Sequence, residues 1–171
     1  MSKTLFVNFR DRGRDLGTEG FWAFDVVVAV FLKHLVDAAS SHQMVQNEGW
    51  LADAVEQWRF NALCGDCGLF LEDSWSDEQV TTFNKLAREA CQVLSKRENI
   101  PAQEIESWQI MDGNDDRCFA RGLPFVTTES AIRLGEAIIK LVDGRLPARP
   151  PATWWFFGTE ESDLTMGRRG E

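Results

Sequence analysis

The residues with the clearest potential for chemistry are two cysteines, Cys64 and Cys67, separated by Gly-Asp and followed by Gly68. Two thiolates at this spacing can supply half of a tetrahedral zinc site. The other half would need a second close pair, which the four cysteines and two histidines of this chain do not form. A thioredoxin-type redox centre is disfavoured because a helix, rather than a strand, is expected before the motif. We therefore favour a tight turn without a cofactor and keep a zinc-stabilised module, with Cys64 and Cys67 as ligands, as an alternative.

An arginine- and glycine-rich loop over residues 10–20 is the second candidate, in this case for an anion. A loop between a strand and a helix can aim backbone N–H groups at a phosphate, which Arg12, Arg14 and Thr18 would help to hold. However, the glycine spacing matches neither the dinucleotide fingerprint nor the P-loop. Three acidic residues in the same loop also offset its arginines. We favour a solvated connection and keep a protein or enzyme that binds a small anion as an alternative.

Residues suited to acid–base or nucleophilic catalysis are sparse. The chain has two histidines, no tyrosine and no Gly-x-Ser-x-Gly elbow. The segment Asp112–Asp116 carries oxygen ligands at the first, third and fifth positions of a calcium loop. Its sixth position is Arg117 rather than glycine, and its twelfth is Leu123 rather than glutamate. We interpret the segment as a polar hairpin turn and lean toward a protein that is not an enzyme.

Composition argues against nucleic-acid and membrane partners. The 18 basic and 27 acidic residues give a net charge of −9 and a pI near 4.8. A nucleic-acid binder needs a basic footprint, and anionic lipid surfaces repel an acidic protein. The longest apolar run, residues 21–32, contains Asp25 and is shorter than the ~20 residues of a membrane span. We expect a cytoplasmic protein with reduced thiols, as a monomer or a homodimer.

The chain is rich in large aromatic residues, with seven tryptophans and twelve phenylalanines. Such side chains often anchor protein interfaces, although we favour a core role for most of them. Together with the acidic charge, they favour a non-catalytic binding or inhibitory protein, of the immunity-protein or antitoxin type, that masks a basic protein partner. The candidate contact residues are acidic side chains and tryptophans: Glu72, Asp73, Trp75, Asp112, Asp115, Asp116, Trp154 and Trp155.

The elements that must position these residues follow from hydrophobic periodicity and capping signals. We expect an α+β fold in a single domain over residues 1–157, with a polar, flexible tail over residues 158–171. About four helices should pack on one face of a small, mostly antiparallel sheet. The predicted strands are Thr4–Phe9, a hairpin over 106–120 and Trp154–Phe157. The predicted helices are Glu19–Ala39 with Thr18 as cap, Gly49–Asn61, a helix from a Ser76/Gln79 capping box to Arg97, and Thr128–Val142.

Overall fold

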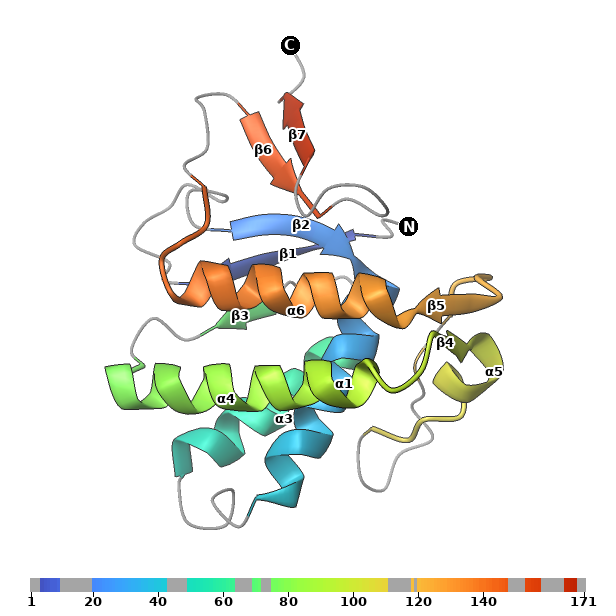
Figure 1. Ribbon diagram of the computed structural model, residues 1–171, viewed down its shortest axis with the longest axis horizontal. Coiled ribbons are helices and arrows are strands. Elements are labelled where there is room, and N and C mark those ends of the chain that lie inside the picture. Colours follow the sequence, from blue (N-terminus) through green and yellow to red (C-terminus); the bar gives the residue numbers. More distant parts are fainter. Residues whose placement is uncertain are drawn as a thin grey trace.

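A computed structural model describes residues 4–9, 20–42, 49–63, 69–71, 75–110, 118, 120–147, 153–157 and 165–168 (Figure 1). Helices and strands follow one another along this part of the chain. In order, they are β1 (Thr4–Phe9), β2 (Gly20–Phe24), α1 (Asp25–Ser41), α3 (Gly49–Leu63), β3 (Leu69–Leu71), α4 (Asp77–Leu94), β4 (Asn99–Pro101), α5 (Ala102–Ile105), β5 (Phe125–Thr127), α6 (Thr128–Val142), β6 (Thr153–Phe156) and β7 (Thr165–Arg168).

The strands form a mixed five-stranded sheet and a separate two-stranded sheet. The larger sheet has the order β3-β1-β2-β6-β7, and β4 pairs with β5 in the smaller one. β1–β2, β6–β7 and β4–β5 are antiparallel pairs, whereas β1–β3 and β2–β6 are parallel pairs. Helix α6 packs against β1 of the larger sheet. The predicted α+β fold is confirmed, with helices packed on a sheet; over both sheets together, three of the strand pairs are antiparallel and two are parallel.

Helix α1 occupies the centre of the structure, between α3, α4 and α6 (Figure 1). Twelve of its seventeen residues are buried. Five of its residues are valines, whose β-branched side chains disfavour helix formation, so burial of apolar surface must stabilise this helix. The helix predicted over Glu19–Ala39 is confirmed in its later part, but it begins at Asp25 rather than at Glu19.

The first residues assigned to that helix instead form strand β2. Strands β1 and β2 form an antiparallel pair, from Thr4 opposite Phe24 to Asn8 opposite Gly20. A Cβ atom on Gly20 would lie 2.2 Å from the Val7 carbonyl oxygen, so this register requires glycine. This segment begins a continuous apolar run, and such a run shows neither the period of a strand nor that of a helix, so its pattern does not distinguish the two. The prediction therefore began the helix too early, and Thr18, its predicted cap, lies outside the described residues.

The starts of α4 and α6 show how local sequence positions the later helices. The Ser76/Gln79 capping box is confirmed: the Gln79 N–H donates to Ser76 Oγ at 3.3 Å, and the Ser76 N–H donates to Gln79 Oε1 at 2.7 Å. In α6 the cap is Thr127, whose Oγ1 accepts from the Ser130 N–H at 3.4 Å. The Thr128 hydroxyl donates to backbone carbonyls of the α4–β4 connection instead. Beyond α6, Gly144 has a φ of 69°, the left-handed conformation in which many helices end.

Two further segments differ from the sequence prediction. In the hairpin expected over 106–120, residues 106–107 instead form the turn that ends α5 and Gln109 makes an isolated bridge, while residues 111–117 and 119 lie outside the described part of the chain. In addition, residues 165–168 of the predicted flexible tail form β7, which pairs with β6. The predicted strand at Trp154–Phe157 corresponds to β6, which lies between β2 and β7 in the sheet.

One cluster of aromatic side chains joins α3 to the first turns of α4. Trp75 contacts Trp50 and Phe83 with ring centroids 5.7 and 5.2 Å apart, and Trp58 contacts Phe83 at 5.7 Å.

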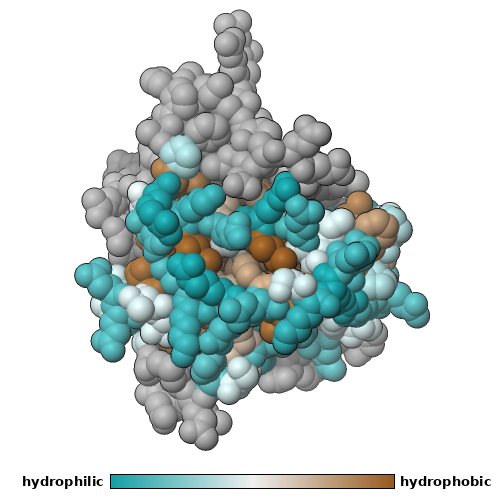
Figure 2. Space-filling view, in the orientation of Figure 1, coloured by the Kyte–Doolittle hydropathy of each residue, from teal (hydrophilic) through white to brown (hydrophobic). Residues whose placement is uncertain are grey.

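Hydrophilic side chains cover most of the outer face formed by α4 and α6, with hydrophobic surface showing between them (Figure 2). Within the described residues, no helix combines the length and apolar character needed to cross a membrane.

Candidate functional site

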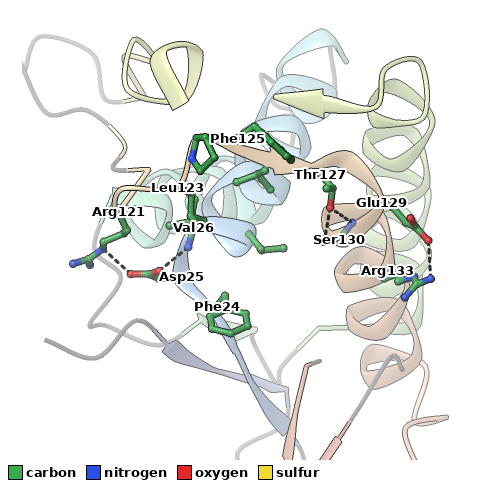
Figure 3. A pocket seen from close by; sticks show the side chains of 13 residues that line it. Phe24, Asp25, Val26, Arg121, Leu123, Phe125, Thr127, Glu129, Ser130 and Arg133 are labelled. Atoms are coloured by element: carbon green, nitrogen blue, oxygen red, sulfur yellow. Dashed lines mark hydrogen bonds and ion pairs between the residues drawn. The ribbon is translucent and has the colours of Figure 1, made fainter. Parts of the chain in front are cut away.

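A cavity of about 660 Å³ lies at the N-terminal end of α1 (Figure 3). Three parts of the chain that are far apart in sequence form its lining. They are the junction of β2 with α1, the stretch from Arg121 through β5, and the first turns of α6. The volume falls within the ~300–1,000 Å³ of ordinary ligand-binding pockets. The cavity is therefore the candidate functional site.

The interior of the cavity is mainly apolar. Val27 and Val126 are buried beneath it, and Phe24 packs edge-on against Phe156 with ring centroids 5.0 Å apart. Leu123 and Phe125 form the opposite wall (Figure 3). Their exposed fractions are 44% and 46%, so this wall leaves large apolar side chains in contact with solvent.

An ion pair between Asp25 and Arg121 closes one end of the cavity (Figure 3). Arg121 Nε lies 2.9 Å from Asp25 Oδ2, and the Val26 N–H donates to Asp25 Oδ1 at 2.8 Å. The Asp25 side chain is only 6% exposed, so its charge needs these partners and the positive end of the α1 dipole to offset desolvation. Arg121 has a φ of 53°, a left-handed conformation that non-glycine residues seldom adopt. The ion pair helps to stabilise this strained conformation.

A second ion pair lies at the other end, on the first turns of α6 (Figure 3). Arg133 lies 2.6 Å from Glu129, one helical turn away, and the exposed fractions of the two side chains are 29% and 72%. Nearby, the Thr127 and Ser130 hydroxyls are 2.6 Å apart, and Thr127 Oγ1 caps the helix. The cavity thus has an apolar lining with one charged pair at each end.

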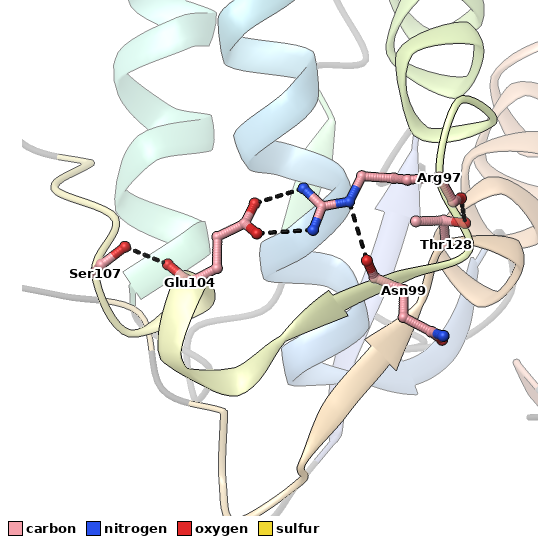
Figure 4. A network of polar contacts seen from close by, with 5 residues as sticks. All are labelled: Arg97, Asn99, Glu104, Ser107 and Thr128. Carbon is pink, nitrogen blue, oxygen red and sulfur yellow. Dashed lines mark hydrogen bonds and ion pairs between the residues drawn. The ribbon is translucent and has the colours of Figure 1, made fainter.

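A polar network behind β4 and β5 holds the cavity wall in place (Figure 4). Arg97 makes two parallel hydrogen bonds to the Glu104 carboxylate, both 2.7 Å, and a third to the Asn99 carbonyl at 3.0 Å. The hydrogen bond to Arg97 lowers the pKa of Glu104, and the same bond raises the pKa of Arg97. On the other side, the Thr128 N–H donates to the Glu98 carbonyl at 2.9 Å. These contacts tie α4, α5 and α6 to the two-stranded sheet.

The described thiols and histidines lie away from this cavity. Burial raises the pKa of Cys91 to about 11 and that of Cys118 to about 12, which leaves both thiols protonated and poorly nucleophilic at neutral pH. Burial also lowers the pKa of His34, whose ring packs against Trp108. Neither His34 nor His42 lines the cavity. The cavity's two side-chain hydroxyl groups, on Thr127 and Ser130, are hydrogen-bonded to each other, and Thr127 caps α6.

Of the residues predicted to contact a partner, one is placed in the core. Trp75 is 8% exposed and packs between Trp50 and Phe83, so it is a core residue rather than a surface anchor. The strand pairing places Trp154 opposite Gly167 and Trp155 opposite Met166. The other predicted contact residues lie outside the described part of the chain: Glu72, Asp73, Asp112, Asp115 and Asp116.

The two alternative sites also lie outside the described residues. This applies to Arg12, Arg14 and Thr18 of the anion site and to Cys64 and Cys67 of the zinc site. Among the residues that are described, no three or more histidine, cysteine, aspartate or glutamate side chains gather where they could hold a metal ion. Both alternatives therefore stay predictions from sequence.

Sequence reasoning did not find the cavity. One signal was present, since Asp25 interrupts the longest apolar run and a buried charge needs a partner. That partner, Arg121, could not be identified because the two residues are adjacent only in the folded chain. Comparison with known proteins gives no further guide: no family model, curated protein or solved structure matches this chain.

Proposed function

We propose that this protein is a non-catalytic binding protein that masks a protein partner, and that the cavity at the start of α1 is part of its contact surface. The exposed wall formed by Leu123 and Phe125 is the observation that supports this proposal most strongly. Exposed apolar side chains around a cavity are typical of interaction sites, and arginine and aromatic residues recur among the side chains that dominate binding energy.

The acidic character of the chain favours a basic partner. A net charge of −9 would speed association with a positively charged protein and would make the association rate fall as salt is added. An immunity-protein or antitoxin role fits this combination of charge and apolar contact, since masking a partner needs a rigid surface and no catalytic group.

A pair of matched substitutions can test the proposal. Phe125 and Phe60 are the same residue type with nearly equal exposed fractions, 46% and 48%, but only Phe125 lines the cavity. Tagged wild-type protein, Phe125→Asp and Phe60→Asp would be used to recover partners from the source cells. Each recovered protein would then be purified, and its affinity for the three forms would be measured by titration calorimetry.

We expect a purified partner to bind wild type and Phe60→Asp alike and to lose most of its affinity for Phe125→Asp. Circular dichroism spectra of the two variants would establish that both are folded. If the two variants bound the partner with equal affinity, whether unchanged or reduced, the assignment of the cavity as the contact surface would be contradicted. An association rate that does not change with salt would contradict the electrostatic part of the proposal.

A further inference from the structure

The cavity borders strand β5. All three residues of β5, Phe125–Thr127, and the two residues before it contribute to the wall. Side chains of a strand point alternately to opposite faces, so a cavity beneath one face would be lined by every second residue. Lining by consecutive residues indicates that the cavity borders the edge of the strand. No third strand pairs with β5 in the described part of the chain.

The hydrogen bonds to β4 establish which backbone groups point toward that open edge. The Ala102 N–H donates to the Pro124 carbonyl at 3.0 Å, and the Thr128 N–H donates to the Glu98 carbonyl at 2.9 Å. In an antiparallel pair, the residues that bond across the ladder alternate with residues whose backbone groups point the other way. With Ile100 opposite Val126, the N–H and C=O of Phe125 therefore face away from β4. An additional strand would meet these groups first.

The two ends of the cavity present opposite charges. In the Asp25–Arg121 pair the cation is more exposed, since the side chains are 6% and 23% exposed respectively. In the Glu129–Arg133 pair the anion is more exposed, at 72% against 29%. A ligand lying along the cavity thus meets a positive group at one end and a negative group at the other, with apolar surface between them (Figure 3).

From these observations we infer that the cavity takes an extended segment of the partner protein, which adds to β5 as a further strand. The segment carries an acidic residue near Arg121, a basic residue near Glu129 and apolar side chains between them. This inference rests on the proposed function and specifies the chemistry of the partner.

Strand β5 is held rigidly in a position where another strand could be added along its edge. Its own strand partner is held by the Arg97–Glu104 hydrogen bonds, and its C-terminal end continues directly into α6. A rigid edge loses little conformational freedom when a strand is added. In strand addition, main-chain hydrogen bonds provide affinity, and pockets for alternate side chains provide specificity. Here the apolar cavity would supply such a pocket and the two ion pairs would select the direction of the segment.

Selection from a library of random eight-residue peptides displayed on phage tests the inference without knowledge of the partner. The full-length protein serves as the target, and Phe125→Asp and Phe60→Asp serve as counter-targets. We expect enriched peptides that depend on Phe125 but not on Phe60. These peptides should share an acidic residue at one end, alternating apolar residues and a basic residue at the other end.

N-methylation of single amides in the best synthetic peptide then distinguishes a strand from other conformations. Methylating an amide that faces β5 removes a hydrogen bond and should weaken binding about tenfold. Methylating the neighbouring amides should have a much smaller effect, so the loss should alternate along the peptide. Glu129→Lys should weaken binding, and exchanging the basic residue of the peptide for glutamate should restore it, whereas Glu136→Lys, on a more distant turn of α6, should have no effect.

Each negative result would bear either on strand addition or on the proposed function. Some peptides could need Phe125 for binding and yet show no alternation in the effect of N-methylation, or could bind as helices. Either result would overturn strand addition and leave the proposed function standing. Recovery of no Phe125-dependent peptide would also overturn it, and the affinity of a purified natural partner would still test the proposed function. If decanoate bound instead and its binding was lost in Phe125→Asp, the cavity would be a site for small amphipathic ligands.

Discussion

The middle of helix α1 and its N-terminal end differ in which side chains are buried and which are exposed. In the middle, Phe31, Leu32 and Leu35 are completely buried among α3, α4 and α6. At the N-terminal end, the charge of Asp25 is buried, while Leu123 and Phe125 beside it are 44% and 46% exposed. The first arrangement lowers the free energy of the folded chain. The second does so much less, which points to a role in binding rather than in folding.

The buried middle should be the region most sensitive to substitution. Phe31→Ala should lower the free energy of unfolding by about 3–5 kcal/mol, because it removes a fully buried ring and leaves a space that the helices cannot close. The ring also packs against Gly135, where an added Cβ would lie 2.5 Å from Phe31 Cε2. Urea unfolding monitored by circular dichroism would measure the loss. Phe60→Ala is the control and should change stability by less than about 0.5 kcal/mol.

At the N-terminal end, stability should depend on a charge pair rather than on apolar burial. Arg121→Met should cost about 2–3 kcal/mol, since it leaves the buried Asp25 carboxylate without its guanidinium partner. This is less than the ~3–5 kcal/mol of a fully buried pair because Arg121 is partly exposed. Urea unfolding of Asp25→Asn with Arg121→Met provides the comparison, and the double variant should be more stable than Arg121→Met alone. If it were less stable, the ion pair would not be the source of the effect.

A smaller effect should appear as pH dependence at the edge of the buried region. Burial lowers the pKa of His34 in the folded chain, so the unfolded chain takes up a proton first as the pH falls. The contribution of His34 to stability is therefore present at pH 7 and decreases as the pH falls from its ordinary pKa of 6.5 toward the lowered folded value. Urea unfolding between pH 7 and pH 5 should show a steeper loss for wild type than for His34→Gln. Parallel curves would contradict this assignment.

The same contrast explains what the sequence could and could not predict. Strand β1, helix α3 and the Ser76 capping box follow from local patterns, and the structure confirms each. Even the burial of Trp75 had a local signal. It directly precedes the helix cap, the position from which an apolar side chain packs back on the helix. We instead treated it as a possible surface anchor because tryptophan is common at interfaces.

The cavity has no comparable local signature. Its lining comes from residues 24–27, 121–127 and 129–133, and only the packing of α1 against α6 brings these segments together. Neither Leu123 nor Phe125 differs in type from the many core residues of this chain. What sets them apart is their exposure, which is a property of the folded structure. The sequence could therefore predict the interior of the protein better than its candidate binding surface.

The smallest stability change should come from the residue on which the proposed function most depends. Phe125→Ser should alter the free energy of unfolding by less than about 0.5 kcal/mol, because the side chain is 46% exposed and its loss opens no closed cavity. Urea unfolding beside Phe31→Ala, the same residue type at 0% exposure, would show the difference directly. A loss above about 2 kcal/mol would mean that Phe125 belongs to the core and would remove the main support for a contact surface. A negligible loss combined with weaker partner binding would mean that this ring serves binding, because the fold itself does not require it.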